Sequence, residues 1–285
     1  MERKRRKQRN KDKQKRQHPL FLVLVFLLGA GLVLFPVVSQ ISYYLASHEN
    51  INQFEKEAAQ IDNKEIDRRI ELAHAYNETV TNKNLVDPYT KLQKEGRTEY
   101  ARMLKVHEQI GYVSVPRIGE KLPIYAGTSE SVLQKGVGHL EGTSLPVGGP
   151  STHTVLTAHR GLPTARLFTD LDKVKKGDIF FVKNIKETLA YKVDQIRVVE
   201  PTDLDAVAIV EGKDYMTLLT CTPYMINSHR LLVRGHRIPY SEKEEKREEA
   251  KAGIPFWMWI LLGLILLVVL LTLYLFWKRR KGKQA

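Results

Sequence analysis

The chain has 285 residues, of which 43% are hydrophobic and 27% are charged, and its net charge is +13. This apolar fraction excludes an intrinsically disordered chain. The excess positive charge lies at the two ends: residues 1–19 hold ten Lys or Arg and two acidic residues, and residues 278–285 hold five Lys or Arg and no acid. Because the segment between these ends is neutral, it lacks the basic surface expected of a nucleic-acid-binding protein.

Two long uncharged runs, residues 20–38 and residues 254–277, lie next to the basic ends. Each is long enough to cross a hydrocarbon core of roughly 30 Å as a helix that rises about 1.5 Å per residue. The second run carries Trp and Tyr near its ends, where such side chains suit the membrane interface. Since basic flanks stay in the cytoplasm, the pattern predicts two transmembrane helices, with both termini cytoplasmic and the intervening segment extracellular.

Each run has an alternative interpretation. The first could be a cleaved signal peptide, because a basic segment precedes it and small residues such as Ser39 and Ala46 follow it. Its length favours an uncleaved signal anchor. The second could be a cell-wall sorting tail, but residues 251–255 read KAGIP and do not form the LPxTG-type motif that such a tail requires.

Residues 39–80 are predicted to form a helical stalk. Their apolar residues recur at helical intervals, with a break near Asp62-Asn63. The recurring residues are Ile51, Phe54, Ala58, Ile61, Ile66, Ile70 and Ala73. We interpret this segment as a solvated stalk that lifts a folded domain off the membrane.

The next segment, residues 81–97, has no periodicity and contains Asp87-Pro88-Tyr89, which predicts a polar loop with a turn. Residues 98–240 then predict one mainly β domain, a barrel or a sandwich, because short β-branched or aromatic runs alternate with Gly, Pro and charged residues. The expected strands contain residues 112–115, 154–157, 179–182, 189–199, 216–220 and 231–233, and short helices are expected at 130–135 and 202–207. Residues 241–253 are alternately charged and predict a solvated linker.

Cys221 is the only cysteine, so it cannot form an internal disulfide. A lone cysteine is most often a small buried hydrophobe. Here it ends an apolar strand just before Pro223, where a strand stops and a substrate can approach. A cysteine nucleophile needs a neighbouring His or cation, and acyl transfer needs positive charge where the carbonyl oxygen becomes negative.

Two residues have suitable positions to assist Cys221. His159 lies at a predicted strand end before a Gly turn, and Arg230 begins the strand that returns from Cys221. By spacing alone Arg234 is nearly as good, since it lies on the same strand face as Arg230. Four further histidines are eligible, but no metal-type spacing links them, and we expect no metal or cofactor. They are His139, His153, His229 and His236.

Three motifs resemble those of the sortase family. Residues 217–221 read TLLTC and are similar to the family's TLxTC motif; residues 157–160 read TAHR and resemble its His segment; residues 229–235 read HRLLVRG and resemble the strand with its catalytic Arg. The resemblance covers residues from about 111 to 240. It implies a β-barrel of about eight strands in which Cys221 is the nucleophile, His159 the general acid and base, and Arg230 the group that holds substrate and oxyanion.

The resemblance also implies a reaction. Sortases cleave an LPxTG-like signal between Thr and Gly and pass the acyl group to an amine. Asp87-Pro88-Tyr89 resembles the lid motif of class C sortases, which polymerise pilins, and a second C-terminal span is similar to that class. The implied lid would pair Asp87 with Arg230 and cover the Cys221 sulfur with Tyr89. The implied substrates are pilin-like surface proteins, with a pilin Lys as acceptor.

Three alternatives stay open from the sequence. The tripeptide at 87–89 could be an ordinary turn with a surface Tyr. The enzyme could be a sortase that attaches proteins to a cell-wall precursor. The chain could also be a non-catalytic, membrane-anchored assembly scaffold with an inactive site.

Overall fold

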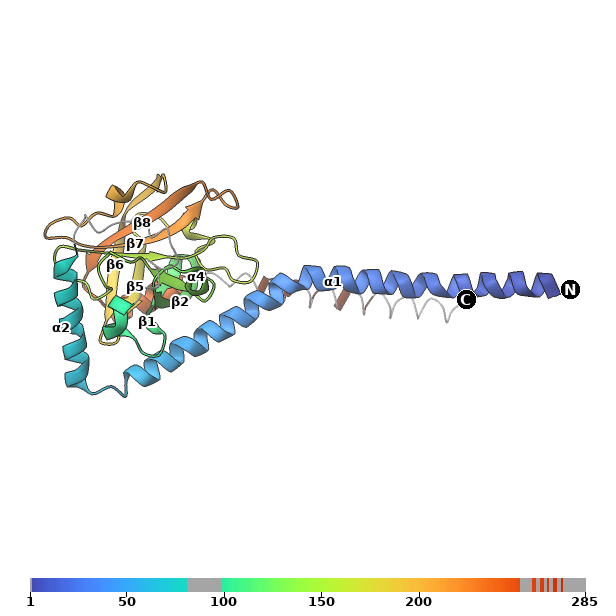
Figure 1. Cartoon of the computed structure of the whole chain (residues 1–285), viewed down its shortest axis with the longest axis horizontal. Coiled ribbons are helices and arrows are strands. Elements are labelled where there is room, and N and C mark those ends of the chain that lie inside the picture. Colours follow the sequence, from blue (N-terminus) through green and yellow to red (C-terminus); the bar gives the residue numbers. More distant parts are fainter. Residues whose placement is uncertain are drawn as a thin grey trace.

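The computed structural model describes residues 2–80 and 99–251, together with scattered helical positions between 258 and 273. A β-barrel forms its body, and a long N-terminal helix runs away from one side of the barrel (Figure 1). The helices are α1 (Glu2–Ala58), α2 (Asn63–Thr79), α4 (Glu130–Leu133) and α5 (Glu242–Ala250), with 3₁₀ helices η2 (Glu99–Leu104), η3 (Pro116–Ile118), η4 (Leu171–Lys173) and η5 (Leu204–Val207). The strands are β1 (Gln109–Val115), β2 (Glu120–Ala126), β3 (Val137–His139), β4 (Thr152–Thr157), β5 (Ile179–Lys183), β6 (Thr188–Val199), β7 (Asp214–Thr222) and β8 (His229–Ile238).

The eight strands close into a barrel in the order β1-β2-β3-β4-β7-β8-β6-β5. Closure leaves no strand edge unpaired. Two neighbouring pairs are parallel, β2–β3 and β4–β7, and the others are antiparallel. The prediction of an eight-stranded, mainly β barrel is therefore confirmed.

Side chains at alternate strand positions fill the barrel, as the two-residue period of a strand requires. Leu156, Met216, Leu218 and Val233 are fully buried in the main core. The residues one position along, Val155 on β4 and Leu232 on β8, belong to a second cluster with Val199 and Val207. This second cluster lies on the outer face of the sheet, because neighbouring strand residues point to opposite faces.

All six expected strands are present, but β2 and β3 were not expected. Pro123 lies in the middle of β2, and a Pro within a run argues against a strand. In the barrel, Pro123 is nevertheless part of β2 and pairs with Tyr112 of β1. Strand β3 has three residues, one of them Gly138, which is too short for a periodic signal. Of the two expected helices, 130–135 contains α4 and 202–207 contains η5.

The segment at 39–80 is helical, and its expected break is confirmed between α1 and α2. Asp62 begins α2 by accepting a hydrogen bond from the Lys64 backbone N–H at 2.9 Å. The expectation of a solvated stalk is wrong, because Ile51, Phe54 and Ala73 are at most 2% exposed and join the barrel core. An apolar helix stripe is stabilised by burial, and the barrel supplies the opposing surface.

Polar contacts reinforce this docking. The Tyr112 hydroxyl of β1 donates to Glu55 of α1 at 2.6 Å. The buried Asn77 side chain of α2 donates to the Leu145 carbonyl at 3.2 Å and accepts from the Leu145 N–H at 2.7 Å. The end of α1 and all of α2 therefore belong to the folded domain.

The predicted charged linker is largely a helix. Residues Glu242–Ala250 form α5, which has no buried residue. Lys246 donates to Glu242 one helical turn earlier at 2.5 Å, a spacing that stabilises exposed charged helices.

The two apolar runs stay predictions. Among the residues that the structure describes, no helix combines the length and apolarity that a membrane span needs. Residues 20–38 form part of α1, and most of residues 254–277 lie outside the described residues.

The docked helix gives the first prediction. Phe54→Ala should lower the free energy of unfolding of the full-length protein by about 3–5 kcal/mol, because a large buried ring leaves a cavity. Leu72→Ala, at a position of α2 that is 48% exposed, is the matched control and should have little effect. Chemical denaturation measures both, and equal small effects would mean that α1 does not pack on the barrel.

Candidate active site

The three predicted catalytic residues lie at the ends of three adjacent strands. Cys221 is the next-to-last residue of β7, His159 follows the end of β4 by two residues, and Arg230 is the second residue of β8. Because β4 and β7 are parallel, their C-terminal ends reach the same end of the barrel. Antiparallel β8 begins where β7 ends, so its first residues lie there too.

The pairing of β4 with β7 aligns His159 with Cys221. Each β4 residue pairs with the β7 residue 62 positions later, from Thr152 with Asp214 to Thr157 with Leu219. Beyond the strand the same offset of 62 relates the Thr220 hydroxyl to the Ala158 carbonyl, and Arg160 to the Thr222 hydroxyl. His159 and Cys221 have this offset too, and they lie between the two contacts.

Cys221 and Arg230 are direct partners in the antiparallel β7–β8 pair. Directly opposed residues point to the same face, with Cβ atoms typically about 4.5–5.5 Å apart. Leu219 and Leu232, two residues along each strand, pack in the outer cluster. Cys221 and Arg230 therefore share that outer face of the barrel.

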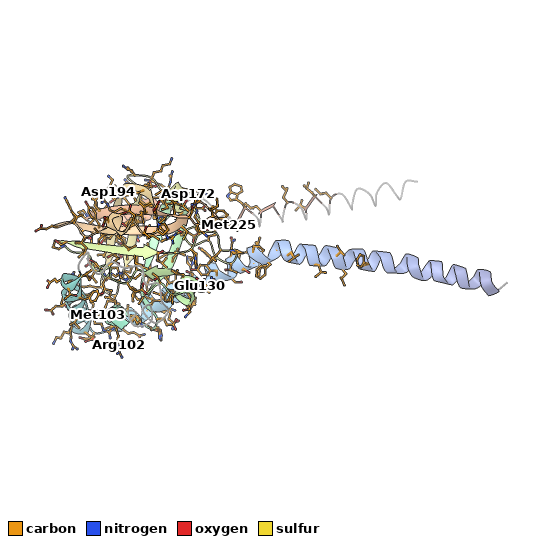
Figure 2. The ribbon with its side chains drawn as sticks, turned by 45° about the horizontal axis from the view of Figure 1, so that its top comes forward. Arg102, Met103, Glu130, Asp172, Asp194 and Met225 are labelled. Atoms are coloured by element: carbon orange, nitrogen blue, oxygen red, sulfur yellow. The ribbon has the colours of Figure 1, made fainter. Side chains whose placement is uncertain are left out.

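His159 has a polar partner that the sequence did not suggest. Its Nε2 lies 3.3 Å from Oε1 of Glu130, and the two side chains are 27% and 70% exposed. Glu130 begins α4, which precedes β3. Figure 2 labels Glu130 and Met225 of the β7–β8 loop on the side of the barrel from which α1 extends. No motif in the sequence identifies Glu130, because it lies near His159 only once the strands of the barrel are assembled.

The two candidate arginines of β8 differ in their partners. Arg230 donates to the carbonyls of Asn227 and His229, both at 3.2 Å. Arg234 forms a bidentate ion pair with Asp194, in which Nε donates to Oδ1 at 2.9 Å and Nη2 donates to Oδ2 at 3.3 Å. Its guanidinium also lies 4.1 Å from the centre of the Tyr215 ring. Since Arg234 is held by a carboxylate on β6, Arg230 is the better placed to meet a substrate at Cys221.

Comparisons with known proteins identify the family of this chain. Residues 113–238 match the family model described as the sortase domain. The chain is 59% identical to a solved structure of Streptococcus pneumoniae Sortase C, covering 97% of that chain and 67% of this one, with a TM-score of 0.63. It is 72% identical to the Sortase C2 of Pilus Island 1 of Group B Streptococcus, covering 100% of that chain and 63% of this one, with a TM-score of 0.59.

This chain belongs to the sortase family. Its similarity to Sortase C structures places it in class C. It is also 33% identical over 122 residues to Sortase A of Staphylococcus aureus, a match that covers 40% of this chain and 55% of that protein. With Sortase A of Bacillus anthracis it shares 28% identity over 137 residues, 47% of this chain and 62% of that protein. The match thus spans less than two thirds of these curated relatives.

Two other histidines of this sortase are structural. His139 Nε2 lies 2.8 Å from the Ser144 carbonyl, and His153 bonds to the Ala208 carbonyl at 2.9 Å and the Thr217 hydroxyl at 2.7 Å. Burial lowers the pKa of each imidazole to about 4. Both are therefore neutral at pH 7. His229 is exposed beside Ser228, and His236 lies 3.6 Å from Asp194.

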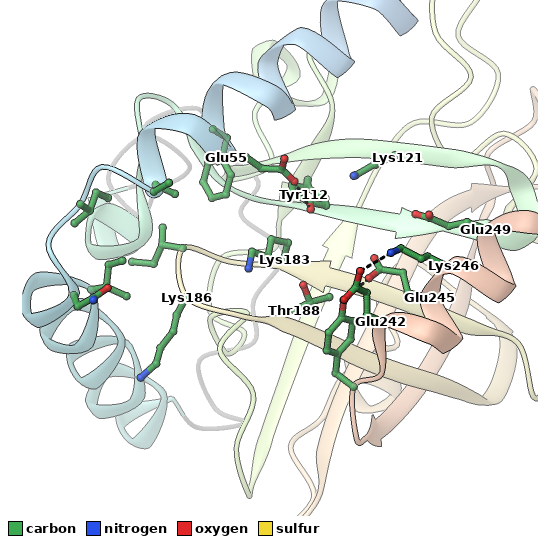
Figure 3. A pocket seen from close by; sticks show the side chains of 18 residues that line it. Glu55, Tyr112, Lys121, Lys183, Lys186, Thr188, Glu242, Glu245, Lys246 and Glu249 are labelled. Atoms are coloured by element: carbon green, nitrogen blue, oxygen red, sulfur yellow. Dashed lines mark hydrogen bonds and ion pairs between the residues drawn. The ribbon is translucent and has the colours of Figure 1, made fainter.

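A separate cavity of about 720 Å³ lies between α1, α5 and the barrel (Figure 3). It borders β1 and β5, which the strand order places across the barrel from β4 and β7. Many of its polar groups bind one another: Tyr112 donates to Glu55, and Tyr240 donates to Glu245 at 2.6 Å. This cavity is not the sortase active site. Among the described residues, no cluster of His, Cys, Asp and Glu is arranged to hold a metal ion.

The lid residues predicted from the sequence, Asp87 and Tyr89, lie outside the described residues. The lid therefore stays a prediction.

Because His139 and His153 are buried as neutral side chains, we expect the free energy of unfolding to fall in acid. Each has a pKa of about 4 in the fold against 6.5 when exposed, so their stabilising effect is complete above about pH 6.5 and is lost as the pH falls toward 4. Unfolding in this window should take up about two protons. His153→Gln should flatten the pH dependence of the urea midpoint, while exposed His229→Gln should not. A slope unchanged by His153→Gln would contradict the assignment.

Proposed function

We propose that this chain is a cysteine transpeptidase whose catalytic residues are Cys221, His159 and Arg230. The supporting observation is their convergence at neighbouring strand ends, with His159 and Cys221 at the offset of the β4–β7 pair and Arg230 opposite Cys221. Membership of the sortase family supports the same assignment. The free thiol of Cys221 is partly exposed, as a nucleophile must be.

The reaction has two acyl-transfer steps. The Cys221 thiolate attacks the Thr carbonyl carbon of an LPxTG-like signal, and the guanidinium of Arg230 stabilises the oxyanion. His159 donates a proton to the departing Gly amine as the C–N bond breaks, which leaves a thioester on Cys221. An acceptor amine then attacks this thioester, His159 accepts its proton, and the C–S bond breaks.

The acceptor that we propose is a Lys amine of a pilin. The support comes from two Sortase C structures to which this chain is similar: the work on the S. pneumoniae enzyme concerns pilin substrate specificity, and the Group B Streptococcus enzyme is pilus-related. Beside Cys221 the β7–β8 loop exposes Tyr224, Met225 and Ile226, at 50%, 70% and 71%. This apolar surface suits the Leu and Pro of a sorting signal.

We also propose the arrangement that the sequence predicts around the catalytic barrel. Helices at 20–38 and 254–277 anchor the chain in the cell membrane, with the barrel outside and both termini in the cytoplasm. The support is the apolar composition of the two runs and the exposure of Leu28, Leu32 and Phe35 on α1, at 62%, 77% and 59%. The loop at 81–97 acts as a lid through Asp87 and Tyr89.

The deciding experiment incubates the full-length protein with pilin subunits that carry sorting signals. We expect Lys-linked pilin multimers and a mass adduct of the cleaved signal on Cys221. Cys221→Ala should give neither product. Transfer only to a cell-wall precursor amine would favour the wall-anchoring alternative, and surface-protein assembly that survives Cys221→Ala would favour a scaffold.

The role of Arg230 gives a separate prediction. Arg230→Ala should lower kcat about 10²-fold, as loss of an oxyanion donor typically does. Arg234→Ala is the matched control on the same strand: it should lower stability by breaking the pair with Asp194 and leave kcat nearly unchanged. Steady-state kinetics with a sorting peptide test both variants, and the opposite ranking of kcat would assign the oxyanion to Arg234.

A further inference from the structure

Arg160, the residue after His159, is held by several contacts at once. Its side chain is 8% exposed, so the guanidinium is nearly buried. Nε donates to the Thr169 carbonyl at 3.1 Å, Nη2 to the Asp172 carboxylate at 2.6 Å, and Nη1 to the Thr222 hydroxyl at 3.1 Å. The guanidinium also lies 5.9 Å from the centre of the Tyr224 ring.

The contact with Thr222 is the one that bears on catalysis. Arg160 is adjacent to His159 in the chain, and Thr222 is adjacent to Cys221. Strand pairing between β4 and β7 ends at Thr157 with Leu219, and one more backbone hydrogen bond follows, from Ala158 to Leu219 at 3.2 Å. The backbone ladder therefore stops before it reaches His159.

Two side-chain contacts continue the alignment beyond the ladder. The Thr220 hydroxyl donates to the Ala158 carbonyl at 2.8 Å, just before the catalytic pair. The Arg160 guanidinium donates to the Thr222 hydroxyl just after it. We propose that Arg160 is a positioning residue that keeps His159 opposite Cys221 by tying the end of β4 to the end of β7.

The geometry of the side chain explains why an arginine is needed. Its planar fork donates to three acceptors in two segments: Thr222 at the end of β7, and Thr169 and Asp172 in the turn that contains η4. A lysine amine is a point charge and cannot reproduce this fixed set of directions. The carboxylate of Asp172 balances the nearly buried charge, which makes its burial tolerable.

Arg160 acts differently from Arg230. The donors of Arg160 are committed to Thr169, Asp172 and Thr222, so they do not hold the oxyanion. The inference rests on the proposed function, because it requires His159 and Cys221 to act as a pair. The two claims can fail separately: activity that survives Cys221→Ala would contradict the function, whereas the experiments below test the positioning alone.

The test compares Arg160→Ala, Arg160→Lys, Thr222→Val and the double variant Arg160→Ala/Thr222→Val in the full-length protein. Thr222→Val removes the hydroxyl at constant side-chain shape, and we expect it to lower kcat about 10-fold with KM within about twofold. Arg160→Ala should lower kcat up to about 10²-fold, the scale that misplacement by about 1 Å can cause. The kcat of the double variant should be no lower than that of Arg160→Ala, and Arg160→Lys should not restore the rate.

The control Arg117→Ala removes a 42% exposed arginine that donates to the Lys173 carbonyl, and it should leave kcat unchanged.

A second readout separates positioning from simple loss of stability. The pH dependence of kcat/KM with a sorting peptide is measured, since its two limbs report the essential acid and base of the free enzyme. Thr222→Val and Arg160→Ala should both change this pH profile in protein that is still folded by thermal melt, because each loosens the placement of His159 beside Cys221. Losses of kcat that multiply in the double variant, or a pH profile that neither change alters, would overturn the proposal.

Discussion

The parallel pairing of β4 with β7 is the constraint on which the site depends. The C-terminal ends of two parallel strands lie at the same end of the sheet. Residues that are far apart in the sequence therefore lie side by side there. The constant offset of 62 positions along the pair aligns His159 with Cys221. Strand β8 then returns antiparallel from β7 and places Arg230 beside Cys221. A shift of one residue between β4 and β7 would turn His159 to the opposite face and separate it from the thiol.

The N-terminal helix is linked to this same end of the barrel. Gln40 of α1 donates to the Pro163 carbonyl at 3.3 Å, four residues after His159. The Tyr43 hydroxyl donates at 3.0 Å to the Lys135 carbonyl, just after the helix that carries Glu130. Gln40 lies two residues beyond the first apolar run. The segment that we propose as an anchor thus continues directly into contacts with the loops that support His159.

A mainly β domain and a candidate nucleophile could be predicted from the sequence because their signals are local, whereas the eight-stranded barrel followed from the resemblance to sortases. Cys221 is the single thiol and lies at the end of an apolar strand, and the six strands that were expected have recognisable composition. Strands β2 and β3 were missed because one contains Pro123 and the other has three residues. The docking of α1 was missed because an apolar stripe shows that a helix needs a partner but does not identify it. Contacts such as Glu130 with His159 depend on register, which no single segment encodes.

Chemically identical side chains have different roles in this fold, and their partners decide the difference. Burial lowers the pKa of His139 and His153 and keeps them neutral, whereas His159 lies partly exposed just beyond a strand end and beside a carboxylate. Among the arginines near β7 and β8, Arg234 is bound to Asp194 on the barrel wall. Arg160 is nearly buried and bonded to three acceptors in two segments, which suits a rigid support. Among the described residues Arg230 donates hydrogen bonds only to nearby carbonyls, which is compatible with the oxyanion role that we propose for its guanidinium.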